Sequence, residues 1–172
     1  AVMLSAETAV GSYPIKAVKT MSDVCIEAEK SPTAKVSHHR LHENFEGVDE
    51  TIAMSSMYAA NHLGAKVVAT LTQTGKTALW MSRISSNISI VAMSDNYKTL
   101  KKVTIYRGVY PCSIEKNSAD DWNDVNSKVI ENLINKSVVD DKDIVIVTKG
   151  MHKDKSGGTN LMKILRVGDG NY

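Results

Sequence analysis

Three hydroxyl side chains, a glycine and a lysine gather in one short stretch, Thr72-Gln73-Thr74-Gly75-Lys76-Thr77. It lies between a predicted strand, residues 66–71, and a predicted helix, residues 77–84. Hydroxyl donors, a cation and the unpaired amides of a helix start together can hold a phosphate group. The nucleotide P-loop would need a glycine five residues before Gly75, where Thr70 stands. We therefore predict a phosphate-binding loop of another kind, with a polar helix cap as the alternative.

A second candidate is Ser156-Gly157-Gly158-Thr159-Asn160, which ends a long loop that also carries Lys149, Lys153 and Lys155. Open α/β sheets bind ligands in the loops beyond the carboxyl ends of their strands. We predict that Gly158, Thr159 and Asn160 close over a ligand whose phosphate is held by the 72–77 loop. A solvated turn is the alternative.

Other reactive side chains are scattered. Arg107 follows a predicted short strand, residues 103–106, and is either an ion-pair anchor or a ligand contact. Ser5 and Glu7 end a predicted strand, where a hydroxyl and a carboxylate can relay a proton. His38 and His42 have a spacing that can chelate metal on a helix. With His39 they are interpreted as a solvated linker face, and no metal site is predicted.

The elements that must position these residues alternate along the chain. After a helix at residues 48–63, strands alternate with helices, which predicts parallel crossovers. The last strand follows a loop without a helix and can run antiparallel at an edge. The predicted fold is an α/β three-layer sandwich whose mostly parallel sheet has about five strands. The predicted strands are 66–71, 89–93, 103–106, 143–147 and 161–167; the helices between them are 77–84, 96–102 and 121–136.

The N-terminal part has a different character. Residues 1–4 are predicted to be a short buried strand, and apolar residues recur at helical spacing from Pro14 to about residue 31. One strand and one helix cannot form a core. We therefore interpret residues 1–31 as a piece of a larger domain, residues 32–47 as a linker and residues 48–172 as a second domain.

Composition narrows the class of protein. The 172 residues include 21 Lys and Arg against 19 Asp and Glu, a net charge of +2. Such balance argues against nucleic-acid or membrane partners. Two cysteines rule out a disulfide framework and fit a reducing cytosol, so a cytoplasmic location is expected. No apolar stretch is long enough to span a membrane, and no signal peptide is expected.

Several motifs, in order, resemble one family. Met3-Leu4-Ser5-Ala6-Glu7-Thr8-Ala9, with Gly11 and residues 13–18, resembles the last strand, loop and helix of the pyruvate kinase barrel. The 72–77 loop resembles the phosphate loop of that family's C-terminal effector domain. Residues 106–111, Tyr-Arg-Gly-Val-Tyr-Pro, are similar to its arginine-glycine-valine-x-proline segment. Residues 143–148 followed by Gly158-Thr159-Asn160 are similar to its final strand pair and effector loop.

The resemblance implies a parent enzyme that transfers phosphoryl from phosphoenolpyruvate to ADP with magnesium and potassium. Its metal-binding and substrate residues would lie upstream of this chain, so the fragment is expected to be inactive and to hold no cofactor. Ser5 and Glu7 would help protonate the enolate. The C-terminal part of the chain resembles bacterial enzymes activated by AMP or sugar monophosphates more than it resembles enzymes activated by fructose 1,6-bisphosphate. Further contacts with the effector could come from Trp122, Lys128 and Arg107. Lys128, however, lies one residue short of the position that an arginine occupies in the bisphosphate type.

A rival hypothesis is an assembly module. In the family this domain forms subunit contacts, and here the edge strand 161–167 and the helix 48–63 would make a homo-oligomer. The loop residues would then be caps. A stand-alone kinase is a third hypothesis, and the missing barrel speaks against it. The sequence identifies neither the effector nor the size of the oligomer.

Overall fold

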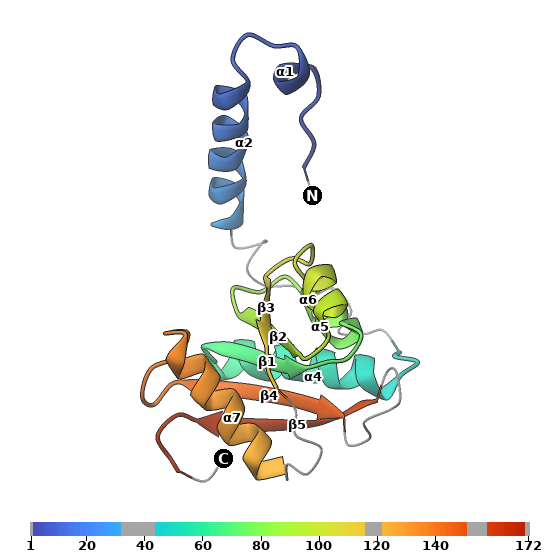
Figure 1. Cartoon of the computed structure of the whole chain (residues 1–172), viewed down its shortest axis with the longest axis vertical. Helices are drawn as coiled ribbons and strands as arrows, with labels where there is room; N and C mark the ends of the chain where they lie inside the picture. Colours follow the sequence, from blue (N-terminus) through green and yellow to red (C-terminus); the bar gives the residue numbers. More distant parts are fainter. Residues whose placement is uncertain (1, 32–43, 116–121, 151–157, 171–172) are drawn as a thin grey trace. The chain divides into compact units, whose positions relative to one another are not determined.

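The computed structural model describes residues 2–31, 44–115, 122–150 and 158–170 (Figure 1). The chain divides into two compact units, Ala1–Ser37 and His38–Tyr172, and each is treated by itself. Most of the predicted linker 32–47 lies outside the described residues, so the predicted boundaries stay a prediction. No helix in the described ranges is long and apolar enough to cross a membrane.

The second unit is built on a five-stranded sheet in the order β3-β2-β1-β4-β5 (Figure 1). Four strands are parallel, and β5 runs antiparallel to β4 at the edge. This confirms the predicted α/β class with its antiparallel last strand. The strands are β1 (Val67–Leu71), β2 (Ser89–Ser94), β3 (Val109–Ser113), β4 (Ile144–Gly150) and β5 (Thr159–Arg166).

Helices cover both faces of this sheet. One face packs against α7 (Trp122–Asn135), through Val125, Val129, Ile130 and Leu133. The other face packs against three helices, α4 (Val48–Leu63), α5 (Lys76–Ser82) and α6 (Tyr97–Val103). Two aliphatic cores result, one on each side of strands that are buried on both faces, as parallel strands usually are.

The predicted strand at residues 103–106 is wrong. Val103 ends α6, and the chain turns before β3 begins at Val109. Gly108 has a positive φ of 66°, which ends the turn at little steric cost. The strand lies at the open edge of the sheet, where Pro111 with its missing N–H is tolerated.

The first unit holds α1 (Ala6–Ala9) and α2 (Pro14–Glu29). The predicted strand at residues 1–4 is also wrong, since Val2–Leu4 have no regular structure and a one-turn helix follows. A strand needs a neighbour to pair its amides and carbonyls, and residues 2–31, the described part of this unit, offer none. The predicted helix from Pro14 is confirmed.

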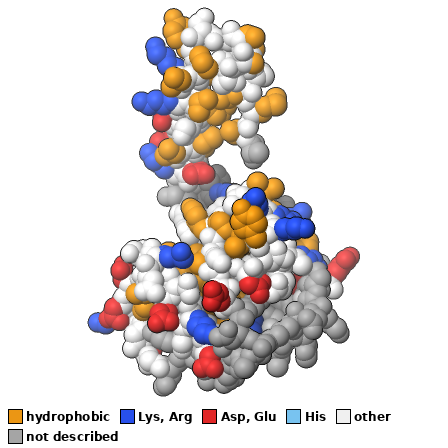
Figure 2. Space-filling model, in the orientation of Figure 1, with side chains coloured by type: hydrophobic (Ala, Val, Ile, Leu, Met, Phe, Trp, Pro, Cys, Tyr) orange, Lys and Arg blue, Asp and Glu red, His pale blue; other side chains and the backbone are white. Residues whose placement is uncertain are grey.

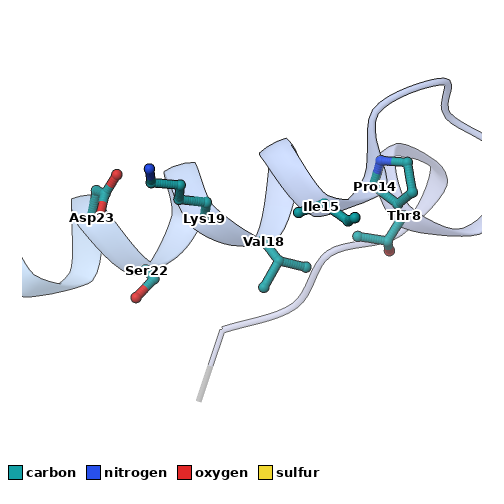
Figure 3. Close-up of a pocket in the computed structure, with 7 residues that line it drawn as sticks. All are labelled: Thr8, Pro14, Ile15, Val18, Lys19, Ser22 and Asp23. Carbon is teal, nitrogen blue, oxygen red and sulfur yellow. The ribbon is translucent and has the colours of Figure 1, made fainter.

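Helix α2 has no buried residue. Figure 2 shows apolar side chains spread over the surface of this unit, and they include Val2, Met3, Val10, Tyr13, Ile15, Val18, Val24 and Ile26. A groove of about 520 Å³ lies along the helix, lined by residues of α1 and α2. Figure 3 shows Ile15 and Val18 on the helix side that faces the segment before α1. The unit therefore displays an apolar helix face that it does not itself cover.

Candidate functional site

The 72–77 loop lies at the carboxyl edge of the sheet, between the end of β1 at Leu71 and the start of α5 at Lys76. Gly75 has a positive φ of 77°, and a Cβ there would lie 2.8 Å from Val103 Cγ1. Both the backbone conformation and the close approach of α6 therefore require glycine. A side chain at this position would push the loop away from α6.

Two of the predicted hydroxyls shape the loop itself. Thr72 Oγ1 accepts a 2.9 Å hydrogen bond from the Gly75 amide. Thr74 Oγ1 lies 3.4 Å from the Lys76 amide and accepts a weaker one. A threonine oxygen that accepts a bond still has its own hydrogen to donate. These hydroxyls can therefore hold the loop and contact a ligand at once.

Helix α6 supports the loop from the side. Thr99 Oγ1 donates a hydrogen bond to the Gln73 carbonyl. Lys102 Nζ lies 3.4 Å from the Thr74 carbonyl oxygen and donates to it. The cation of Lys102 was not among the residues predicted from the sequence. Its signal was only its position in the last turn of a basic helix, which many solvated helices share.

The second predicted segment meets the first. Thr77 Oγ1 and Thr159 Oγ1 share a 2.7 Å hydrogen bond, although they are 82 residues apart, and both residues are buried. The pairing register shifts between Lys149 and Gly150, where β4 pairs with the start of β5. A Cβ at Gly150 would lie 2.5 Å from the Gly158 carbonyl oxygen, so the close approach of the two strand ends depends on glycine.

Lys76 pairs with a residue that the sequence reasoning missed. Its Nζ lies 2.9 Å from Oδ2 of Asp49, a residue in the first turn of α4. The Asp49 side chain is 6% exposed and the Lys76 side chain 48% exposed. A signal existed, because Asp49 is four residues before Ala53 and so falls on the sheet-facing stripe of the helix, where a carboxylate is unusual.

Arg107 is not brought to this site. It precedes β3 at the amino edge of the sheet, whereas the sequence analysis placed it after a strand; that placement is wrong because β3 starts later than predicted. Its Nη1 donates a 3.0 Å hydrogen bond to Ser85 Oγ. Since β1 is five residues long, the two edges are separated by roughly 15 Å.

The remaining predicted contacts of the second unit divide between two places. Asn160 is exposed at the start of β5, next to Thr159. Trp122 is the first residue of α7, and Lys128 is half-buried further along that helix. Because α7 covers the face opposite to α5, Lys128 belongs to the other layer of the sandwich.

Ser5 and Glu7 were predicted at the end of a buried strand, and that setting is wrong. Ser5 directly precedes α1, and its amide donates a 3.3 Å hydrogen bond to Glu7 Oε2. Hydrogen bonds from the backbone amides of Glu7 and Ser5 lower the pKa of the exposed Glu7 carboxyl from its ordinary value. The pair is a local helix-start contact within the first unit.

The histidines His38, His39 and His42 lie outside the described residues. So do Lys153, Lys155, Ser156 and Gly157. Within the described parts of the chain no three His, Cys, Asp or Glu side chains gather closely enough to hold a metal ion.

The sheet order, the two helical layers and the glycine-dependent loop define a three-layer α/β domain. Residues 50–165 match the family described as "Pyruvate kinase, alpha/beta domain". The chain therefore belongs to the pyruvate kinase family.

Similar proteins come from several bacteria. The chain is 47% identical over 168 residues to a pyruvate kinase of Buchnera aphidicola subsp. Baizongia pistaciae and to pyruvate kinase II of Salmonella typhimurium. In both cases the match covers 97% of this chain and 35% of the relative. A pyruvate kinase of Haemophilus influenzae is 45% identical over 152 residues. The chain thus spans about a third of the length of these relatives.

Proposed function

We propose that residues 48–172 bind a phosphorylated small molecule, AMP or a sugar monophosphate, as the regulatory domain of a pyruvate kinase. The observation that carries this proposal is the 2.7 Å bond between Thr77 and Thr159. It joins the two segments predicted to surround the ligand. Both lie at the carboxyl edge of the sheet, where open α/β sheets bind their ligands.

The chemistry of the loop suits a phosphate monoester. Thr72 and Thr74 accept bonds from loop amides and keep a hydrogen to donate. The Thr77–Thr159 pair shares one hydrogen bond, which leaves the second hydroxyl hydrogen for another acceptor. Lys76 in the loop and Lys102 on the neighbouring helix α6 supply positive charge. Gly158 and Asn160 would then close over the rest of the ligand.

The whole enzyme would convert phosphoenolpyruvate and ADP to pyruvate and ATP in the cytoplasm, with magnesium and potassium bound elsewhere. Residues 1–31 would belong to its catalytic barrel, where Val2–Leu4 would gain the strand neighbours that they lack in this unit. Ser5 and Glu7 would assist protonation there. The exposed apolar residues of α2 support this assignment, since barrel neighbours would cover them. The 172-residue chain alone would not catalyse the reaction.

Regulation would follow from differential affinity. An effector changes activity only to the extent that it binds one quaternary state better than the other. A different position of Gly158 and Asn160 around a bound phosphate is the change that would distinguish those states. Lys128 would not be needed for a monophosphate, because it lies further along α7, which covers the opposite face of the sheet.

Calorimetry of the 172-residue chain tests the proposal. AMP and ribose 5-phosphate should release or absorb heat on binding, and fructose 1,6-bisphosphate should bind no more tightly than they do. Lys76→Met should weaken AMP binding about tenfold, the value of one lost charge-assisted contact. Lys66→Met removes the same charge near Asp143 at the amino edge and should leave binding unchanged. No heat with any of the three ligands would contradict the proposal.

A second candidate function, assembly, rests on a separate observation. Strand β5 pairs with β4 on one side only, and Ile164 on it is 46% exposed. Such an edge can pair with the same strand of a second copy. Sedimentation should then show a dimer that Ile164→Lys dissociates while AMP binding is retained. A monomer at all concentrations would contradict assembly through this strand.

A further inference from the structure

We propose that Asp49 is an internal counter-ion of the anion site: its carboxylate neutralises Lys76 and thereby weakens the binding of every phosphorylated ligand. This inference rests on the proposed function of the 72–77 loop and adds a determinant of its affinity. The residue comes from a different helix, α4, and neither the loop motif nor the second ligand segment includes it.

The position of Asp49 follows from the sequence of α4. The residue falls on the stripe that also carries Ala53, Met57 and Ala60, all of which pack on the sheet. It also sits in the first turn of a sixteen-residue helix, where the helix dipole favours a negative charge. The carboxylate is therefore held in place by the packing of the whole helix.

The two partners differ in their access to water. The Asp49 side chain is 6% exposed, so the Lys76 ammonium at 2.9 Å replaces much of its hydration. Lys76 is 48% exposed and can reach solvent or a ligand. The Lys76 ammonium group carries three hydrogens, and the 2.9 Å contact with Asp49 Oδ2 engages at most one of them. The others can point toward a phosphate.

The position of Asp49 behind Lys76 determines whether its carboxylate weakens or strengthens phosphate binding. A phosphate that contacts Lys76 from the solvent side has the Asp49 carboxylate on the far side of the same ammonium. Like charges about 6 Å apart repel, and in a partly exposed site that repulsion weakens binding by about tenfold. A different role, in which Asp49 only orients Lys76 toward the ligand, has the opposite sign. In that case removal of the carboxylate weakens binding.

The test is calorimetric titration of the 172-residue chain with AMP. Asp49→Asn keeps the size of the side chain and removes its charge, and it should tighten AMP binding about tenfold. Glu46→Gln is the matched control, because Glu46 is an exposed acid three residues earlier and its loss makes the same change in net charge. It should change the affinity by less than about twofold, since exposed charges are screened.

The outcomes separate the two claims. If the wild-type chain binds AMP and Asp49→Asn binds it equally well or more weakly, the counter-ion inference is overturned. The proposed function then still stands. Binding by neither protein overturns both. Binding detected only with Asp49→Asn supports the inference.

Urea unfolding provides a readout without any ligand. Lys76→Met should destabilise the fold by stranding the buried carboxylate, and Asp49→Asn introduced with it should restore most of that loss. If Lys76→Met lowers the free energy of unfolding equally in the wild-type chain and in the Asp49→Asn chain, the two charges are not coupled. That result would overturn the inference.

Discussion

Helices α2 and α4 are both sixteen residues long, and both carry apolar residues at helical spacing. They differ in how far neighbouring elements bury these residues. Helix α4 has six buried residues, and α2 has none. Met57 in α4 is fully buried, while Ile15 in α2 is 84% exposed. Helix formation is a local matter of spacing, caps and propensity, whereas burial requires a partner surface.

The difference also separates the two units chemically. The second unit closes its sheet between two helical layers and places its hydroxyls, Lys76 and Asp49 at one edge. The first unit holds only local contacts, such as the Ser5 amide on the Glu7 carboxylate and the Lys30–Glu27 pair. Helix α2 therefore displays an apolar face that the described part of its own unit leaves exposed.

The largest difference between the helices should appear on truncation of an apolar side chain. Met57→Ala should lower the free energy of unfolding by about 2–5 kcal/mol, because it leaves a cavity in a closed core. Ile15→Ala should change it by less than about 0.5 kcal/mol, as for other exposed positions. Urea unfolding followed by circular dichroism measures both. Equal losses would mean that α2 is covered in solution, for instance by a second copy.

The difference in burial between the two units also applies to the two cysteines, since each unit contains one of them. Cys112 is buried on β3, and this burial raises the pKa of its thiol, although the Lys136 ammonium acts in the opposite direction. Cys25 is half-buried in α2. A thiol reagent at neutral pH should modify Cys25 at least about a hundredfold faster than Cys112, whose reaction waits for opening of the core. Cys25→Ser should remove the fast phase, and similar rates for both thiols would contradict the contrast.

The helix ends differ as well. Helix α4 ends at Gly64, which has a φ of 62° and leaves room for a side chain, so only backbone strain opposes substitution. Gly64→Ala should therefore cost about 1 kcal/mol of stability. Lys30 ends α2 in the right-handed region, and Lys30→Ala should have almost no effect on global unfolding. A smaller loss at Gly64 than at Lys30 would contradict this explanation.

The smallest expected effect concerns the start of α1. Because backbone amides lower the pKa of Glu7 when α1 is formed, this contact contributes stability above the ordinary carboxyl value of about 4.5 and loses it as the pH falls through the lowered pKa. Carboxyl resonances followed by NMR should give Glu7 a pKa below that of a glutamate in an unstructured peptide. Glu7→Gln should remove the acid-dependent fraying of α1. An ordinary Glu7 pKa would show that the contact is not kept in solution.

Most of the second unit could be predicted from the residues alone. The alternation of apolar strands with amphipathic segments predicted its α/β class, its parallel crossovers and its antiparallel edge strand. This was possible because the spacing of apolar residues along the chain differs between strands and helices. The helix from Val48 to Leu63 was also predictable from its acidic first turn and from Gly64 at its end. The late start of β3 was not, because a turn that holds Gly108 can begin at any of several nearby residues.

The 72–77 loop was predicted to bind phosphate from its residue types, since glycine, hydroxyls and lysine between a strand and a helix suit an anion, and that role stays a prediction. Three features could come only from the folded chain: the Thr77–Thr159 bond, the Lys76–Asp49 pair and the exposure of α2. Each depends on which distant surfaces meet or fail to meet. Local spacing determines what a segment can form, but distances between remote segments are set by the packing of the whole unit.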